Sequence, residues 1–179
     1  FKLLHANGTL ELRRGVGAFV RDTPGIPPDP LGLSQITDKH KLLLDWYEAR
    51  LTLEPPSMRW IVERASPEEI DRLQALEEQV ALTIGSGGDY WMLDMEFHSA
   101  LAKATQNEIL HRMLTGIGQS VQELFSLSKE FQLVEPFSLL ALRSHGEIVK
   151  FLRLRDAEGA ELAMRYHLIQ CIRRLKREA

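Results

Sequence analysis

The feature that most constrains this fold is a helical repeat of apolar side chains, which runs from about Gln35 to the end of the chain. Apolar residues three and four apart line one face of a helix. No alternating pattern typical of a strand is present after Val20. Short connections place consecutive helices side by side, so the pattern predicts an all-α fold, an antiparallel bundle of six or seven helices.

Breaks in the repeat set the expected helix boundaries. Pro55-Pro56 is expected to stop the first long helix, since proline removes a backbone donor. Ser66 is followed by Pro67, with Glu69 at the third helical position, which is typical of a capped helix start. The expected helices are Asp38–Glu54, Ser57–Ala65, Ser66–Ile84, Asp89–Thr105, Asn107–Phe131, Glu135–Leu154 and Asp156–Arg177.

The start of the chain has a different organisation. Phe1–Ala6 is interpreted as the tail of a helix, and Thr9–Arg13 and Ala18–Arg21 as the strands of a short hairpin. Thr23–Asp29 is rich in proline and predicts a stiff linker. Because a lone hairpin is marginally stable, we expect a fragment of a larger unit, with further residues upstream of Phe1. The expected domains are 1–22, a linker at 23–34, and a helical domain at 35–179.

Composition limits the classes of function. The net charge of −3 divides unevenly: the first 21 residues have four cationic side chains against one carboxylate, which leaves −6 for the remainder. The single Cys171 allows no internal disulfide and fits a reducing, cytoplasmic compartment. No apolar run approaches the roughly 20 residues that span a bilayer, so no membrane association is expected.

Asp94 and His98 are the first candidate site residues. They are four residues apart, which places both side chains on one face of a helix. The same stripe contains Trp91 and Leu101, so the carboxylate and the imidazole point toward the core. Burying either group without a partner is costly.

Two downstream histidines are candidate partners. His145 shares a helical stripe with Val149, and His167 shares one with Met164. One aspartate and three histidines pointing inward make up the donor set of a divalent metal site. Taken singly, each histidine is also compatible with a hydrogen-bonded core residue.

Several motifs together resemble a known family. The chain is similar to the ligand-binding domain of the FadR subfamily of GntR-type transcriptional regulators over about residues 38–177. The motifs, in the order of the family, are Glu48-Ala49-Arg50, Leu53-Glu54-Pro55, Ala65-Ser66-Pro67-Glu68-Glu69-Ile70, Asp94-Met95-Glu96-Phe97-His98, Ala104-Thr105-Gln106-Asn107, Ser144-His145-Gly146-Glu147-Ile148, Asp156-Ala157-Glu158-Gly159-Ala160 and His167-Leu168.

The resemblance implies a metal site and an effector. The family's metal ligands fall on the set Asp94, His98, His145 and His167, which suits a divalent ion of the Zn, Ni or Mn type. The effector implied is a small organic acid beside the metal. We expect Arg50 to bind its carboxylate, since a guanidinium can contact both oxygens. An ion pair of Arg50 with Glu48 or Glu54 on the surface of its own helix is an equal alternative.

The resemblance extends to the basic start. Asn7–Val20 looks like the end of the recognition helix and the wing of a winged helix-turn-helix. Arg13 and Arg14, beside the permissive Gly15, are expected to contact a DNA phosphate or the minor groove. A solvated turn is the alternative. The family implies operator DNA as a partner and a homodimer.

Two other classes of function compete with a regulator. A metal-dependent hydrolase could activate water with an Asp/His cage. The chain lacks an adjacent His-Asp pair, however, and Glu96 points away from the Asp94 and His98 stripe. A purely structural helical adaptor would leave the inward Asp and His unexplained. We therefore predict a metabolite-responsive DNA-binding regulator and not an enzyme.

Overall fold

Among the described residues, regular structure begins with the predicted hairpin. The computed structural model describes residues 10–13, 15–20, 32–126 and 134–178. Strand β1 (Leu10–Arg13) pairs antiparallel with β2 (Gly17–Val20), so that Leu10 lies opposite Val20 and Arg13 opposite Gly17. The predictions for Phe1–Ala6, Arg14 and Thr23–Asp29 fall outside the described residues.

Helices form the rest of the described chain. The bounds are η1 Leu33–Gln35, α2 Lys39–Arg64, α3 Pro67–Gly85, α4 Trp91–Ala104, α5 Glu108–Ser126, α6 Val134–Arg153 and α7 Ala157–Glu178. The six α-helices among the described residues confirm the predicted all-α bundle. None of these helices is both long and apolar enough to cross a bilayer.

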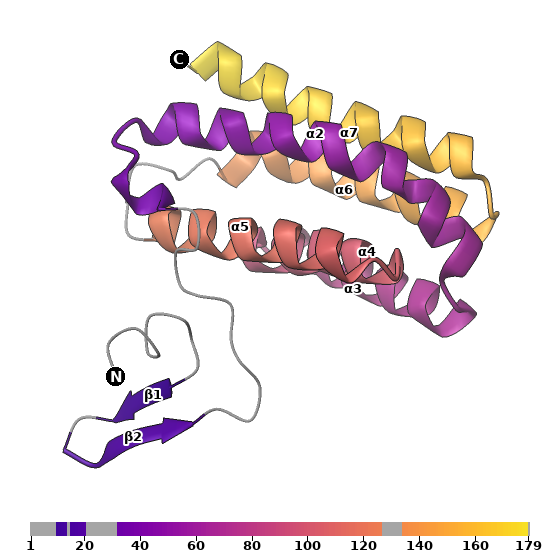
Figure 1. The fold of residues 1–179 in the computed structure, drawn as a ribbon. Helices are drawn as coiled ribbons and strands as arrows, with labels where there is room; N and C mark the ends of the chain where they lie inside the picture. The colour runs from indigo at the N-terminus through magenta and orange to yellow at the C-terminus, as the bar shows by residue number, and fades with distance from the viewer. Residues whose placement is uncertain (1–9, 14, 21–31, 127–133, 179) are drawn as a thin grey trace.

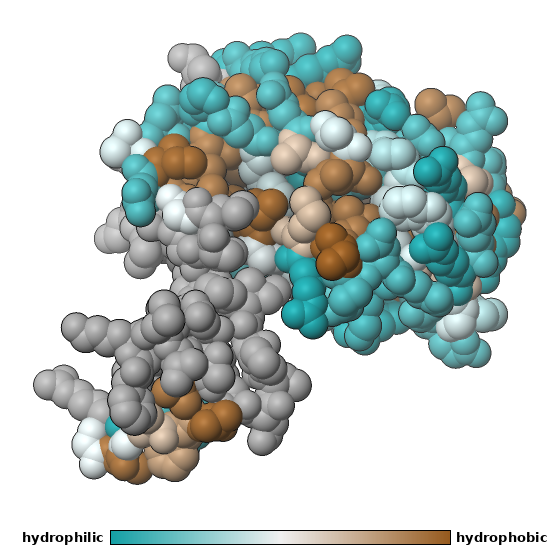
Figure 2. Space-filling model, viewed as in Figure 1, coloured by the Kyte–Doolittle hydropathy of each residue, from teal (hydrophilic) through white to brown (hydrophobic). Residues whose placement is uncertain are grey.

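The helices pack in two groups (Figure 1). Helices α2, α6 and α7 lie together on one side, and α3, α4 and α5 lie on the other. Contacts of α2 with α4 and of α3 with α6 join the two groups. The core runs between the groups and includes Trp46, Phe97, Ile148 and Leu168. On the face shown in Figure 2, hydrophobic side chains gather in a band across the middle of the bundle, with hydrophilic residues around it.

The helix starts predicted from capping residues are present. The Ser66 hydroxyl accepts a hydrogen bond from the backbone N–H of Glu69 at 3.2 Å, and the Glu69 carboxylate accepts one from the Ser66 N–H at 2.8 Å. This reciprocal capping box satisfies donors that helix geometry leaves unpaired. Asp156 accepts from the Gly159 N–H at the start of α7 in a similar way.

The predicted stop at Pro55-Pro56 is wrong. Helix α2 continues through both prolines to Arg64, so the expected helices Asp38–Glu54 and Ser57–Ala65 are one element. The prolines remove two adjacent backbone donors, while the Ser57 hydroxyl donates to the Glu54 carbonyl at 2.7 Å. Buried residues on both sides, Tyr47 and Ile61 among them, hold the two halves in the core, and Figure 1 shows α2 changing direction along its length.

The capping box gives the first testable prediction. Replacing Ser66 by Ala removes the acceptor for the Glu69 N–H, so we expect the free energy of unfolding to fall by about 1 kcal/mol. Urea denaturation of the full-length protein measures the change. Ser86→Ala is the control, because the Ser86 hydroxyl donates to a carbonyl at the other end of α3 and caps no N–H. An equal effect of the two substitutions would contradict a capping role.

Candidate metal centre

Three histidines from three helices meet in the centre of the bundle. His98 comes from α4, His145 from α6 and His167 from α7, and each is at most 4% exposed. One ring nitrogen of each lies within 4.8 Å of the others. The rings of His98 and His167 stack with centroids 5.2 Å apart, and the ring of Phe97 stacks on His145 at 4.3 Å.

Asp94 lies beside this cluster. Its side chain is buried one turn before His98, and its Oδ1 is 3.3 Å from His145 Nε2. It is not a member of the group whose ligand atoms all lie within 4.8 Å of one another. Burial raises the pKa of Asp94, while His98 and Arg50 oppose this effect. The structure thus brings three of the four expected ligands together and places the fourth against one of them.

Each of the three histidine rings has at least one nitrogen that makes no hydrogen bond among the described residues. His98 Nδ1 is 2.6 Å from Glu54 Oε2, and His167 Nδ1 is 2.7 Å from the Ser144 hydroxyl. Nε2 of both rings, and both nitrogens of His145, have no hydrogen-bond partner among the described residues. Buried polar atoms rarely remain unpaired. A ring that is hydrogen-bonded through one nitrogen and open at the other is the usual arrangement of a metal-binding histidine.

The donor set fits a divalent metal ion. Ligands at about 2.0–2.1 Å from one Zn²⁺ stand roughly 3.4 Å apart, so the three nitrogens, all within 4.8 Å of one another, need to approach by at most about 1.4 Å. Burial lowers the pKa of His145 and of His167, which keeps both rings neutral near pH 7. Metal ions bind the neutral form of imidazole.

A buried ion pair on α2 borders the cluster. Arg50 is fully buried, and its Nε donates to Glu54 Oε1 at 2.6 Å. Its guanidinium lies over the ring of Tyr47 at 5.0 Å, and its Nη1 and Nη2 have no hydrogen-bond partner among the described residues. The pairing with Glu54 considered from the sequence is therefore present, but it is in the core and not on the helix surface.

The charges of this pair are mutually stabilised. Burial alone would raise the pKa of Glu54, but Arg50 and His98 outweigh burial and hold it at about 2. Burial alone would lower the pKa of Arg50, but Glu54 outweighs it. Glu54 was not predicted as a site residue from the sequence. The available signal was its position one helical turn after Arg50 and directly before Pro55.

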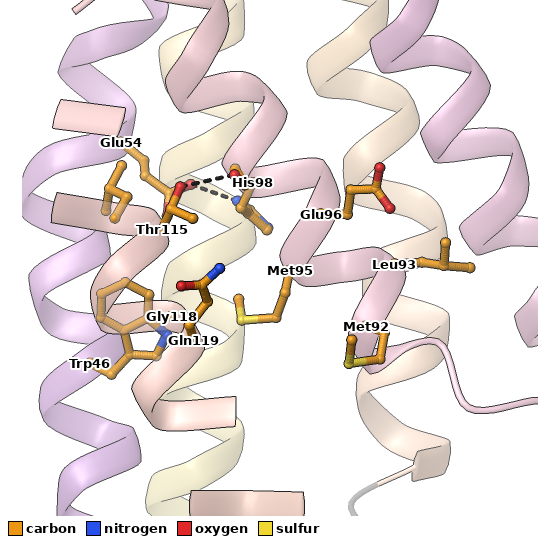
Figure 3. Close-up of a pocket in the computed structure, with 12 residues that line it drawn as sticks. Trp46, Glu54, Met92, Leu93, Met95, Glu96, His98, Thr115, Gly118 and Gln119 are labelled. Atoms are coloured by element: carbon orange, nitrogen blue, oxygen red, sulfur yellow. Dashed lines mark hydrogen bonds and ion pairs between the residues drawn. The ribbon is translucent and has the colours of Figure 1, made fainter. Parts of the chain in front are cut away.

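A cavity of about 280 Å³ reaches the cluster from the side of α4 and α5. Glu54 and His98 are part of its lining, and Arg50 is not. Figure 3 shows Trp46, Met95 and Gln119 around the same space, and Leu93 and Glu96 of α4 are also part of its lining. Gly118 faces this space, where a Cβ would lie at ordinary contact distances of 3.6 Å from Trp46 and 3.7 Å from Met95. Of the lining residues named here, only His98 was predicted as a site residue from the sequence.

Arg13 and Gly15, the two described residues that are expected to contact DNA, lie at the hairpin tip. Arg13 is exposed, its Nε donates to Glu11 at 3.0 Å, and its guanidinium lies 4.9 Å from the centre of the Phe19 ring. Gly15 is exposed in the turn with a φ of 77°, a conformation that glycine adopts readily. Arg14 lies outside the described residues.

Comparison with known proteins places these features in a family. A family model described as the FCD domain matches residues 45–170. The Uxu operon transcriptional regulator of Escherichia coli K12 is 29% identical over 195 residues, which cover 97% of this chain and 68% of the relative. The galactonate operon transcriptional repressor of the same strain is 23% identical over 180 residues, which cover 98% of this chain and 78% of the relative.

A solved structure agrees with the sequence relatives. Streptococcus agalactiae GntR superposes with a TM-score of 0.77 at 29% identity, over 96% of this chain and 78% of that chain. Among the sequence relatives, the chain spans about two thirds of the length of the Uxu operon regulator. These matches confirm the resemblance to GntR-type regulators. They also confirm that the chain is not an enzyme, because the relatives are regulators by name, and the hydrolase alternative is set aside.

The buried histidines predict how stability depends on pH. Burial lowers the pKa of His145 and His167, whereas histidine in an unfolded chain titrates near 6.5. Below that pH the unfolded chain binds protons that the folded chain excludes. The free energy of unfolding of the metal-free protein should therefore fall from about pH 6.5 toward pH 5, by at most about 1.4 kcal/mol per pH unit for each histidine.

Urea denaturation in the presence of EDTA at pH 7.5 and pH 5.5 measures this loss. His145→Gln removes one of the titrating groups and should flatten the dependence. His111→Gln is the matched control, since His111 lies away from the cluster near Glu108. A wild-type stability that does not change between the two pH values would refute the assignment.

Proposed function

This chain belongs to the FCD domain family and contains the helical domain of a GntR-type regulator, and from that premise we propose that it is the sensing part of a metabolite-responsive, DNA-binding transcriptional regulator. The observation on which the proposal depends is a group of buried nitrogens in the centre of the bundle that have no hydrogen-bond partner among the described residues. The open nitrogens of three histidines lie beside an Arg50 whose two terminal nitrogens are also unpaired among the described residues. A metal ion with a bound carboxylate would satisfy both sets.

The metal would be held by Asp94, His98, His145 and His167. Neutral imidazoles and one carboxylate suit a divalent ion of the Zn, Ni or Mn type. Asp94 needs only a small shift to join, since its Oδ1 is already 3.3 Å from His145 Nε2. When bound, the ion would supply positive charge and open coordination positions for an acid oxygen. The surrounding chain keeps the site away from bulk water, because all four side chains are buried.

The effector would be a small organic acid that enters through the cavity between α4 and α5. The cavity volume of about 280 Å³ suits a metabolite better than a larger ligand. A relative is named for a galactonate operon, and galactonate is a carboxylate. Arg50 would hold the effector carboxylate through Nη1 and Nη2, while its Nε stays on Glu54. Because Arg50 is not part of the cavity lining, the carboxylate would have to move beyond the lining residues Glu54 and His98 to reach it.

The DNA contact would come from the domain that precedes the bundle. The exposed tip of the hairpin, with Arg13 and Gly15, has the charge and the backbone freedom of a wing that approaches a phosphate. Arg14 would take part in the same contact. We place the regulator in the cytoplasm as a homodimer on two operator half-sites. Light scattering of the full-length protein would contradict the dimer if it found a stable monomer.

Removal of the metal gives a testable prediction. Zn²⁺ should raise the free energy of unfolding of the EDTA-treated full-length protein, by about 2.7 kcal/mol at a Zn²⁺ concentration 100 times Kd. In His145→Ala this gain should largely disappear, because a ligand is lost. The comparison of each protein with and without Zn²⁺ separates metal binding from any general loss of stability. His111→Ala is the control, and an unchanged gain in His145→Ala would contradict the site.

The link between effector and operator gives a second prediction. Candidate carboxylates are titrated into the full-length protein with and without operator DNA. A true effector should change operator affinity by about 5–150-fold, and the operator should change effector affinity by the same factor. A metal-bound acid that leaves operator affinity unchanged would exclude a sensing role.

Gly118 provides the variants for that experiment. Gly118→Leu should fill the cavity against Trp46 and Met95 and abolish effector binding, while Zn²⁺ still binds. Gly118→Ala is the matched control, because its Cβ would make ordinary contacts of 3.6 and 3.7 Å and leave most of the space open. If Gly118→Leu binds the effector as well as wild type does, the cavity is not the effector site.

A further inference from the structure

Glu54 is the only described residue whose side chain bonds both to a histidine of the cluster and to Arg50. Its Oε1 accepts from Arg50 Nε, and its Oε2 is 2.6 Å from His98 Nδ1. The side chain is 3% exposed. Both oxygens are thus engaged in a site where water does not compete for them.

The state of Glu54 determines the state of His98. Its Oε1 is paired at 2.6 Å with the buried guanidinium of Arg50, a side chain that is always charged in proteins, so the geometry of this ion pair makes the carboxyl group an anion. An ionised carboxylate can only accept hydrogen bonds. His98 Nδ1 must therefore carry the proton in their shared bond, and in a neutral ring this leaves the lone pair on Nε2. That Nε2 is the atom without a partner among the described residues.

The other two histidines have no such fixed partner. Ser144 can donate to His167 Nδ1 or accept from it, because a hydroxyl does both. His145 makes no hydrogen bond through either ring nitrogen among the described residues, although Asp94 lies 3.3 Å from its Nε2. Glu54 is thus the anion that can set a tautomer in the cluster from outside the expected ligand set.

We propose that Glu54 is a positioning residue: it fixes His98 in the Nδ1–H tautomer, so that the Nε2 lone pair faces the metal position, while it holds Arg50 beside the cluster. The metal part of this proposal rests on the proposed function. The tautomer part rests only on the hydrogen bonds of Glu54 with Arg50 and His98. Glu54 itself need not touch the metal or the effector.

A nearly isosteric substitution tests the proposal. An amide has one acceptor and one donor group, and Arg50 Nε can only donate, so it takes the oxygen of Gln in Glu54→Gln. The NH₂ group then faces His98 Nδ1, which must accept. The proton of His98 moves to Nε2, and this removes the lone pair from the metal position. Loss of such a supporting partner typically lowers metal affinity by about 10–100-fold.

The experiment begins with the metal-free, full-length protein labelled with ¹⁵N-histidine. Long-range ¹H–¹⁵N spectra at pH 7.5 should show His98 protonated at Nδ1 in wild type and at Nε2 in Glu54→Gln. Glu54→Asp, which keeps the anion, should retain the wild-type tautomer. Glu48→Gln is the matched control, since Glu48 is an exposed carboxylate on the same helix that faces Lys176. A wild-type His98 protonated at Nε2 overturns the proposal even if the Gln variant does not fold.

Titration with Zn²⁺ then separates the two levels of inference. Wild type and Glu48→Gln should bind alike, and Glu54→Gln should bind about 10–100-fold more weakly. If wild type binds Zn²⁺ and Glu54→Gln binds it equally well, the positioning role fails while the metal site stands. If wild type binds no Zn²⁺, the metal site fails and the positioning role toward it falls with it, whatever tautomer the spectra show.

Discussion

The burial of charge in the middle of the bundle is the constraint on which the rest of this structure depends. Arg50 and Glu54 form an ion pair that is almost fully removed from solvent. Desolvating two such groups costs several kcal/mol each, and well-packed apolar residues are often as stable. A pair of this kind is therefore weak evidence for stability. The proposed binding site would account for it, because Glu54 contacts His98, one of the three clustered histidines with open nitrogens.

Much of the fold could be predicted because local signals and packing agree. Ser66 and Glu69 form the capping box that their spacing predicts, and the apolar repeat gives the buried face of each helix. The stop at Pro55-Pro56 was wrong because tertiary packing overrides a local breaker. The prolines remove two donors, but Met58 and Ile61 are buried on the continuing side, so ending α2 there would expose core side chains.

The candidate site was predictable in part for the same reason. Helical spacing gives the direction of a side chain, which is why His98, His145 and His167 are all found inside. It does not give the position of one helix along the axis of another. The sequence therefore could not show that the nitrogens of the three histidines meet, while Asp94 lies against His145. Glu54 was missed because a carboxylate one turn after an arginine is far more often a surface pair. Only the packing of α4 against α2 reveals its second partner.

The placement of the ion pair on α2 suggests how the proposed sensor would transmit a signal. Arg50 and Glu54 belong to the helix that follows the predicted linker, whereas the histidines belong to α4, α6 and α7. A carboxylate held between Arg50 and a metal would join α2 to the other three helices, and Glu54 would pass any movement of Arg50 to His98. A coupling energy of 1–3 kcal/mol, the usual scale of allosteric linkage, is no larger than one or two charge-assisted hydrogen bonds. In the proposed sensor, a change confined to this ion pair would therefore be on the energy scale needed to alter operator binding.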